Sequence, residues 1–328
     1  MDTIIVIGSN SFSGATFIDF ALAKGARVIG LSRSSELLDV FLPYKWNDHK
    51  NFTFYPLDLN KHLVEITKLI QDIKPSYVIN FAAQSMVAES WINPGDWFMT
   101  NVVSTIKFHD ELRKCNFLKR YVHISTPEVY GSCSGFVTED YYFNPSTPYA
   151  VSRAAADMSL RTFQAAYNFP VVTTRAANVY GPGQQLYRII PRTILYILLG
   201  HKLQLHGGGV STRSFIHMKD VSDATWKIMQ GGQNGHTYHI STNEVISIRE
   251  LVELICSKLN VKFEDCVDFV GERTGKDAAY HLDSKKLRSE LNWEDMISLN
   301  SGIDECILWA KNNLDILKKQ PLNYEHKA

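Results

Sequence analysis

The first half of the chain alternates short apolar runs, rich in β-branched residues, with longer stretches whose apolar positions recur every three or four residues. The short runs predict strands at residues 3–8, 27–31, 52–56, 77–80, 120–125 and 171–175. The periodic stretches between them predict helices, for example at residues 61–73, 97–114 and 147–167. Apolar strands that alternate with helices are typical of a parallel sheet covered on both faces.

After residue 178 this alternation stops, and glycine-rich segments at 207–209, 231–232 and 271–275 predict loops between shorter elements. We therefore expect an α/β fold, a Rossmann-type doubly wound parallel sheet with a smaller α/β lobe toward the carboxyl end. The predicted core domain comprises residues 1–176 and 214–242, and the predicted second lobe comprises residues 177–213 and 243–328.

Composition narrows the class of protein. Apolar residues make up 45% and charged residues 21% of 328 residues, as in ordinary globular proteins. The 34 basic residues balance 34 acidic ones, which argues against a nucleic-acid partner. The apolar run at 194–199 is too short to span a membrane, and the first residues lack the basic region of a signal peptide. Five cysteines without a Cys-x-x-Cys pair predict reduced thiols and a cytoplasmic location, and the histidines show no metal-ligand spacing, so we expect no metal.

The first predicted strand runs into a helix through the sequence Ile-Val-Ile-Gly8-Ser-Asn-Ser11-Phe-Ser-Gly14. Glycine here allows a tight turn and a close approach to a pyrophosphate, which the helix amino terminus then stabilises. The usual three-glycine spacing would place a glycine at Ser11, and an ordinary strand–helix turn is the alternative interpretation. We predict cofactor contacts from Gly8, Asn10, Ser11, Phe12, Ser13 and Gly14.

The second predicted strand ends at Ser32-Arg33-Ser34, which contains one cation and no carboxylate. An acidic residue at this position would bind the adenosine ribose and repel a 2′-phosphate, so its absence favours NADP over NAD. A solvated loop arginine, or one that stacks on adenine, is the alternative interpretation of Arg33.

Polar residues follow the fifth predicted strand, at the sheet edge where open parallel sheets bind ligands. Ser125, Thr126 and Glu128 stand there, and Tyr149 and Arg153 lie four residues apart on one face of the next helix. A fixed cation beside a phenol lowers its pKa, so we expect the Tyr149 pKa to move toward neutrality and Tyr149 to act as a base. Ser125 and Thr126 could hydrogen-bond the same substrate hydroxyl.

Together these motifs resemble those of the extended short-chain dehydrogenases/reductases and, among them, the nucleotide-sugar 4,6-dehydratases that act on dTDP-glucose and GDP-mannose. The resemblance covers most of the chain. Further matching segments are Leu57-Asp58-Leu59, Asn80-Phe-Ala-Ala-Gln-Ser85, Arg175-Ala-Ala-Asn178-Val-Tyr-Gly-Pro182, Arg213-Ser-Phe-Ile-His-Met-Lys-Asp220 and Arg273-Thr-Gly-Lys-Asp277.

The resemblance implies an NAD(P)-dependent hydro-lyase of carbohydrate biosynthesis that turns a nucleotide-diphosphate hexose into its 4-keto-6-deoxy form. Tyr149 would take the proton of the 4-hydroxyl while hydride passes to the nicotinamide. The resulting ketone acidifies the hydrogen on carbon 5, which Glu128 would remove. Water then leaves from carbon 6, and the stored hydride returns to that carbon. Thr126 and Arg153 complete the implied catalytic set.

The resemblance also implies which residues bind the ligands, with the dinucleotide in the core domain and the nucleotide sugar in the second lobe. Further cofactor contacts would come from Ser32, Arg33, Ser34, Asp58, Leu59, Ala82, Ala83, Ser85, Asn101, Tyr149 and Arg153. Substrate contacts would come from Ser85, Ser125, Thr126, Glu128, Asn178, Arg188, Leu205, Arg213, Asn243 and Arg273, with Arg213 in a loop between two short strands. A homodimer through the helices at 97–114 and 147–167 is implied as well.

Three departures from the family pattern bear on the chemistry. Pro127 stands where an aspartate protonates the departing hydroxyl in the dTDP-glucose enzymes, so Glu128 would act first as base and then as acid. Arg153 replaces the usual lysine and keeps its charge but cannot release a proton. Ser11 reshapes the phosphate turn. Two alternatives stay open: an epimerase or decarboxylase of nucleotide sugars on the same fold, and a non-catalytic NAD(P)-binding sensor.

Overall fold

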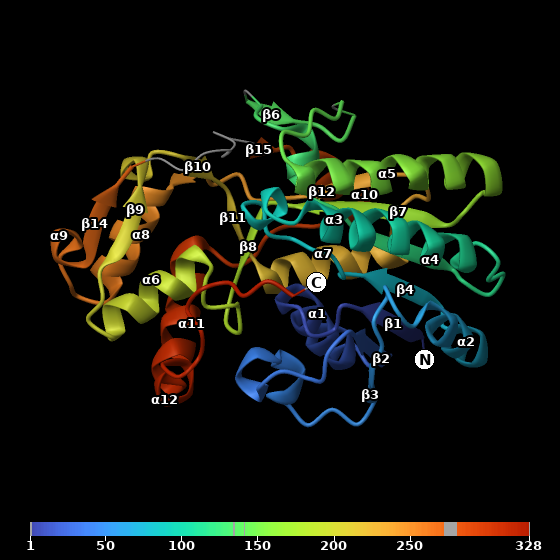
Figure 1. Cartoon of the computed structure of the whole chain (residues 1–328), viewed down its shortest axis with the longest axis horizontal. Coiled ribbons are helices and arrows are strands. Elements are labelled where there is room, and N and C mark those ends of the chain that lie inside the picture. The colour runs from blue at the N-terminus through green and yellow to red at the C-terminus, as the bar shows by residue number, and fades with distance from the viewer. Residues whose placement is uncertain (1, 134, 141, 272–280, 328) are drawn as a thin grey trace.

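The computed structural model describes residues 2–133, 135–140, 142–271 and 281–327 (Figure 1). Its centre is a seven-stranded parallel sheet with the strand order β12-β7-β5-β4-β1-β2-β3. The strands are β1 (Thr3–Ile7), β2 (Arg27–Ser32), β3 (Phe52–Pro56), β4 (Tyr77–Asn80), β5 (Arg120–Ile124), β7 (Val171–Ala176) and β12 (Thr237–Ile240). The six strands predicted from the sequence are confirmed, each to within one residue at its ends. The predicted doubly wound α/β fold is confirmed.

Helices cover both faces of this sheet, because the residues of each buried strand point alternately to opposite sides. Ile4 and Val6 of β1 pack in one apolar cluster with α1 (Phe12–Ala23) and α7 (Met218–Gly231). Ile5 and Ile7 pack in a second cluster with α2 (Leu63–Ile73), α4 (Thr105–Leu112) and α5 (Pro148–Tyr167). The predicted helix at 97–114 is divided into α3 (Pro94–Phe98), a π-helical segment η4 (Met99–Ser104) and α4.

The second lobe lies beside the carboxyl edge of the sheet (Figure 1). Its helices are α6 (Ile189–Leu198), α8 (Ile248–Lys258), α9 (Phe263–Cys266), α11 (Leu299–Asn312) and α12 (Leu314–Leu317). Short strands pair as β9 (Leu203–His206) with β14 (Val267–Val270), β10 (Thr212–Arg213) with β13 (Ile246–Ser247), and β8 (Asn178–Tyr180) with β11 (Phe215–His217). The predicted domain boundaries stay a prediction.

The remaining elements are short or connect the two parts. Strand β6 (Phe136–Val137) pairs with β15 (His281–Leu282), and α10 (Lys285–Leu291) packs on β12 and α7. Single helical turns are η1 (Asp39–Phe41), η2 (Pro43–Lys45), η3 (Glu89–Trp91), η5 (Pro127–Tyr130) and η6 (Gly207–Gly209). Among the described residues, no helix combines the length and apolar character needed to cross a membrane.

Candidate active site

A cavity of about 730 Å³ lies where the carboxyl ends of the central strands face the second lobe. This is the position at which open parallel sheets bind their ligands. Most of the residues predicted to contact substrate, and several predicted to contact cofactor, line it. They are Ser11, Phe12, Ser13, Ala83, Ser85, Ser125, Thr126, Glu128, Tyr149, Arg153, Asn178, Arg188, Leu205 and Arg213.

The turn between β1 and α1 requires glycine at two positions. Gly8 has a φ of +83°, and a Cβ there would lie 2.6 Å from the backbone nitrogen of Ala82. A Cβ at Gly14 would lie 2.4 Å from the carbonyl oxygen of Gly8. Ser11 caps α1: its Oγ accepts from the Gly14 N–H at 3.0 Å and donates to the Gly8 carbonyl at 2.7 Å. The serine that replaces the family glycine therefore ties the turn together.

This turn fits the dinucleotide cofactor that the fold implies. The amino terminus of α1, a helix of 12 residues, begins at the turn and favours an anion there. The buried atoms Ser9 Oγ and Asn10 Oδ1 have no hydrogen-bond partner among the described residues, so polar groups remain for a ligand. The Nδ2 of Asn10 donates to the carbonyls of Ser34 and Ser35 at 3.0 and 2.9 Å, which fixes the loop after β2 against the turn.

The other predicted cofactor residues lie outside the wall of the cavity. The Asn101 amide is used within the fold, because it bonds the backbone of Gln84 and the Ser152 hydroxyl. Arg33 donates to the carbonyl of Lys327 at 2.9 Å, and the preference for NADP stays a prediction. The residues outside the wall are Gly8, Asn10, Gly14, Ser32, Arg33, Ser34, Asp58, Leu59, Ala82 and Asn101.

Thr126 joins two of the predicted catalytic groups. It caps η5, and its hydroxyl contacts the carboxylate of Glu128 directly. It also forms a side-chain hydrogen bond with Tyr149. Tyr149 stands in the first turn of α5, where the Thr147 side chain caps the helix by accepting from the Ala150 N–H at 3.1 Å. The side chains of Tyr149, Thr126 and Glu128 therefore converge in the cavity.

The prediction that the pKa of Tyr149 moves toward neutrality is wrong. Burial and the nearby Glu128 carboxylate raise the pKa of this phenol, Arg153 and Thr126 lower it, and the balance leaves it at about 12. Tyr149 is 8% exposed, so the loss of hydration destabilises a phenolate there by more than the attraction to the Arg153 charge stabilises it. The buried phenol holds its proton in this arrangement of residues.

Arg153 is directed at the end of β5. Its Nη2 contacts the carbonyl of Ile124 and lies 3.5 Å from Nε2 of His123. The side chain is 2% exposed, so its charge is held in the buried part of the cavity wall. From there its charge lowers the pKa of Tyr149, which is the direction of the Arg153 effect that the sequence analysis predicted.

Beneath Arg153 lies a buried network that the sequence analysis did not identify as functional. The Oδ2 of Asp157 accepts from Ser125 Oγ and from Arg175 Nη2, each at 2.7 Å. Burial alone would raise the pKa of Asp157, but Arg175 and His123 hold it well below its usual value. The available signal was spacing, because Asp157 follows Arg153 by one helical turn. Because the Ser125 hydroxyl donates to Asp157, only the acceptor side of its oxygen remains for another partner.

The second lobe contributes cations to the opposite wall. Arg188 directly precedes α6, and Arg192, one turn later, also lines the cavity. Sequence reasoning missed Arg192, although its spacing from Arg188 was a signal. Arg213 lines the cavity from β10, a two-residue strand paired with β13, so the expectation of a loop position is wrong. Arg273 lies outside the described residues.

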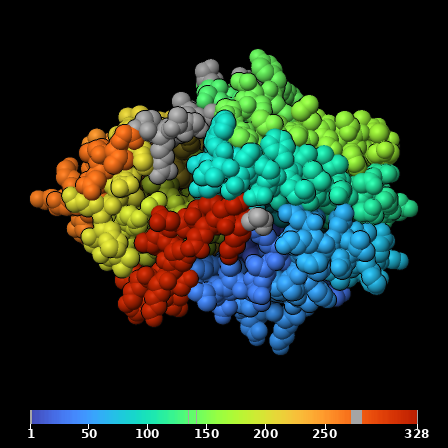
Figure 2. All heavy atoms as spheres, viewed as in Figure 1, coloured from blue at the N-terminus to red at the C-terminus, as the bar shows by residue number. Residues whose placement is uncertain are grey.

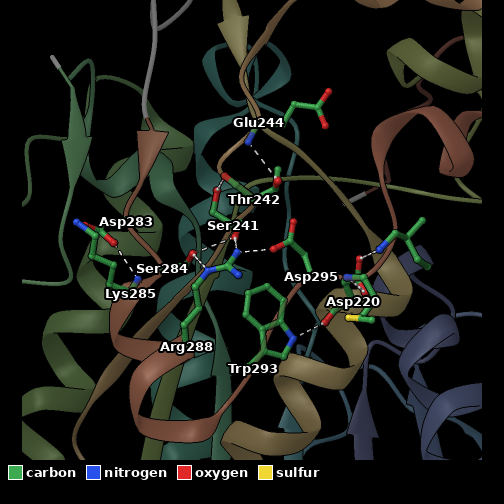
Figure 3. Close-up of polar contacts among 12 residues, drawn as sticks. Asp220, Ser241, Thr242, Glu244, Asp283, Ser284, Lys285, Arg288, Trp293 and Asp295 are labelled. Carbon is green, nitrogen blue, oxygen red and sulfur yellow. Dashed lines mark hydrogen bonds and ion pairs between the residues drawn. The ribbon is translucent and has the colours of Figure 1, made fainter.

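Asn243, predicted to bind substrate, does not line the cavity. It lies in the link between β12 and β13, which polar contacts hold against the core (Figure 3). Arg288 donates to the carbonyl of Ser241 at 3.0 Å and contacts the Asp295 carboxylate. Asp220 of α7 accepts from two backbone N–H groups at residues 296 and 297.

Comparisons with known proteins identify the family of this chain. Residues 5–306 match the family described as GDP-mannose 4,6 dehydratase. A dTDP-glucose 4,6-dehydratase of Xanthomonas campestris is 31% identical over 95% of this chain and 94% of its own length. The crystal structure of a dTDP-glucose 4,6-dehydratase from Streptomyces venezuelae with NAD bound is 28% identical, covers 95% of this chain and 98% of that one, and has a TM-score of 0.88.

A dTDP-glucose 4,6-dehydratase from Bacillus anthracis, solved in complex with NAD, is also 28% identical, with a TM-score of 0.87 over 96% of this chain and 98% of its own. The resemblance inferred from the motifs is thereby confirmed along nearly the whole chain. The chain belongs to the nucleotide-sugar 4,6-dehydratase family of the extended short-chain dehydrogenases/reductases.

Proposed function

We propose that this protein is an NAD(P)-dependent hydro-lyase that removes water from a nucleotide-diphosphate hexose and yields the 4-keto-6-deoxy sugar. The observation that carries the proposal is the convergence of Thr126, Glu128 and Tyr149 on one cavity. The names of the similar curated proteins support the same reaction. The identity of the nucleotide and of the hexose is left to the substrate assay below.

Tyr149 would act on the 4-hydroxyl of the sugar. When bound, NAD supplies a hydride acceptor whose nicotinamide ring carries a positive charge. Such a charge adds to that of Arg153, and both oppose the burial that raises the pKa of Tyr149. In the phenolate form that these two charges favour, Tyr149 then accepts the hydroxyl proton, and its hydrogen bond with Thr126 positions the phenol oxygen.

Glu128 would act on carbon 5. Once carbon 4 is a ketone, the neighbouring C–H bond is acidic because the electron pair left behind is delocalised as an enolate. The Thr126 hydroxyl contacts the Glu128 carboxylate and orients it. Glu128 takes the proton from carbon 5 and, since Pro127 has no proton to give, passes it to the hydroxyl that leaves carbon 6 as water. When the hydride returns to carbon 6, carbon 5 takes up one proton, which balances the proton that Tyr149 accepted from the 4-hydroxyl.

The second lobe would hold the nucleotide diphosphate. Three arginines line this wall of the cavity. Arg188 directly precedes α6, Arg192 lies in α6, and Arg213 lies in β10. Guanidinium groups suit diphosphate oxygens because their planar donors bind two oxygens at once. In the described part of the chain, Leu205 and Phe215 add apolar surface to this wall.

The test is incubation of the purified protein with a panel of nucleotide hexoses, each labelled with deuterium at carbon 4. We expect one hexose to lose a single water and to carry the deuterium to carbon 6. A decarboxylase would instead release carbon dioxide from a nucleotide uronic acid, and an epimerase would leave the mass unchanged. Cofactor binding without turnover of any hexose would favour the sensor. Each of these three results would contradict the proposal.

We also propose a cytoplasmic homodimer. Exposed apolar side chains lie on η4, at Met99 and Val103, and on the neighbouring α5, at Val151 and Met158. An exposed apolar face of this kind supports association of two helices from each subunit. Sedimentation equilibrium tests it: Met158→Glu should shift the protein to monomer, and a wild-type monomer at micromolar concentration would contradict it. The five cysteines, all free thiols, support the location.

A further inference from the structure

Residues 321–327, the last that the structure describes, cross the boundary between the two parts of the molecule. Their side chains alternate: Leu322, Tyr324 and His326 are partly buried, and the residues between them are exposed. Such alternation is typical of an extended segment that packs along one face. In Figure 2 this segment, in red, runs from the second lobe to the place where the cyan and blue atoms of the core meet.

The first half of the segment contacts the second lobe. Leu322 packs against the apolar cluster that α6 and α11 share. The Asn323 side-chain oxygen accepts from Arg192 at 3.2 Å, and the Tyr324 ring meets Tyr187 edge to face, with 5.3 Å between ring centres. Arg192 and Tyr187 both line the main cavity, so this half of the segment lies at the rim of the site.

The second half contacts the core domain. His326 stacks on Trp97 of α3, with ring centres 5.0 Å apart and an angle of 15° between the planes. Its Nε2 also lies 2.7 Å from Oδ2 of Asp96 in the same helix. A stacked ring with a hydrogen bond on its edge holds His326 in a single orientation. The segment is therefore anchored on both parts of the molecule.

The end of the segment passes in front of the phosphate turn. The carbonyl of Lys327 accepts from Gln84 Nε2 at 2.7 Å and from an Arg33 Nη at 2.9 Å. Gln84 follows β4 and Arg33 follows β2, whereas β1 lies between these two strands in the sheet. A carbonyl held by the side chains that follow β2 and β4 lies on the side of β1 from which its turn leaves, at the edge where the adenosine half of a dinucleotide binds.

We propose that residues 321–327 form a strap that closes the adenosine end of the cofactor cleft and slows the release of the dinucleotide. The proposed dehydration returns the cofactor to its starting state in each turnover, so release is not a step of the cycle. A strap that delays release therefore does not slow the reaction. This inference rests on dinucleotide binding and does not depend on which hexose is the substrate.

The experiment measures how fast bound NADH leaves the protein, from the change in NADH fluorescence after mixing with excess NAD. One variant ends at Leu322, which keeps the apolar anchor, and a second carries Tyr324→Ala with His326→Ala. The control is Glu325→Ala, whose side chain is exposed in the same segment. We expect the dissociation rate to rise at least about tenfold in both strap variants and to stay unchanged in the control.

Circular dichroism of each variant without NADH verifies that the fold is retained. A dissociation rate within about twofold of wild type in both strap variants would overturn the proposal. Slower release from the shortened chain would overturn it too, because the segment would then compete with the cofactor instead of enclosing it. Hexose turnover at saturating NAD separates this proposal from the proposed function, since we expect it to be retained in the strap variants.

Discussion

Replacing Asp157 with asparagine tests whether the buried network under the active site stabilises the fold. Asp157 is 3% exposed and Arg175 is 1% exposed, and their Nη2–Oδ2 distance is 2.7 Å. Asp157→Asn keeps the shape of the side chain but leaves the Arg175 charge buried without its carboxylate. Breaking a buried pair in this way costs about 3–5 kcal/mol. Surface pairs, by contrast, contribute little.

The expected change in melting temperature follows from the size of the protein. An unfolding entropy of about 2 cal/mol/K per residue gives about 0.7 kcal/mol/K for the chain, so Tm should fall by about 4–7 °C. The matched control is Asp110→Asn, which removes the carboxylate of a partly exposed pair with Arg113 at the surface and should leave Tm nearly unchanged. Calorimetry of both variants makes the measurement. Equal Tm values for Asp157→Asn and wild type would refute the reasoning.

Three further predictions follow from the same geometry. The pKa of Asp157 in the folded protein lies below its unfolded value of about 3.9. The carboxylate therefore contributes its full share to the free energy of unfolding above about pH 3.9, and this share is lost as the pH falls through the folded pKa. The Tm difference between wild type and Asp157→Asn should shrink in acid. Gly8→Ala should abolish NADH binding measured by fluorescence, since its Cβ would collide with Ala82, whereas Gly95→Ala, with open space around it, should not. Tyr149→Phe should bind NADH normally yet turn over hexose about 10²–10⁴-fold more slowly in a steady-state assay; near wild-type turnover would remove Tyr149 from the proposed mechanism.

The fold was predictable because its signals are local. Most strands of the first half are apolar runs that alternate with stretches of helical periodicity, and capping residues such as Thr147 mark where helices begin. The helix predicted at 97–114 was divided because a π-helical segment inserts at Met99, which periodicity does not reveal. The short paired strands of the second lobe, two to four residues each, are too brief to carry a pattern.

The site was predictable in its motifs but not in its electrostatics. Sequence places Tyr149 and Arg153 on one helix face, and the structure agrees, but burial dominates the pKa of the phenol and only three-dimensional packing determines burial. Asn243 is absent from the lining of the cavity, so its predicted substrate contact stays a prediction. The bridge from Lys327 to Gln84 joins residues 243 positions apart, beyond any local signal.

The central claim is that Glu128 removes the proton from carbon 5 after carbon 4 has been oxidised. The most direct test is a single-turnover reaction of the Glu128→Gln variant with the hexose that the panel identifies. The control variant is Glu264→Gln, which changes an exposed glutamate on α9. The account predicts that the variant still reduces NAD, seen as NADH absorbance, while water loss slows by about 10²-fold or more. Water loss at the wild-type rate in Glu128→Gln would contradict it.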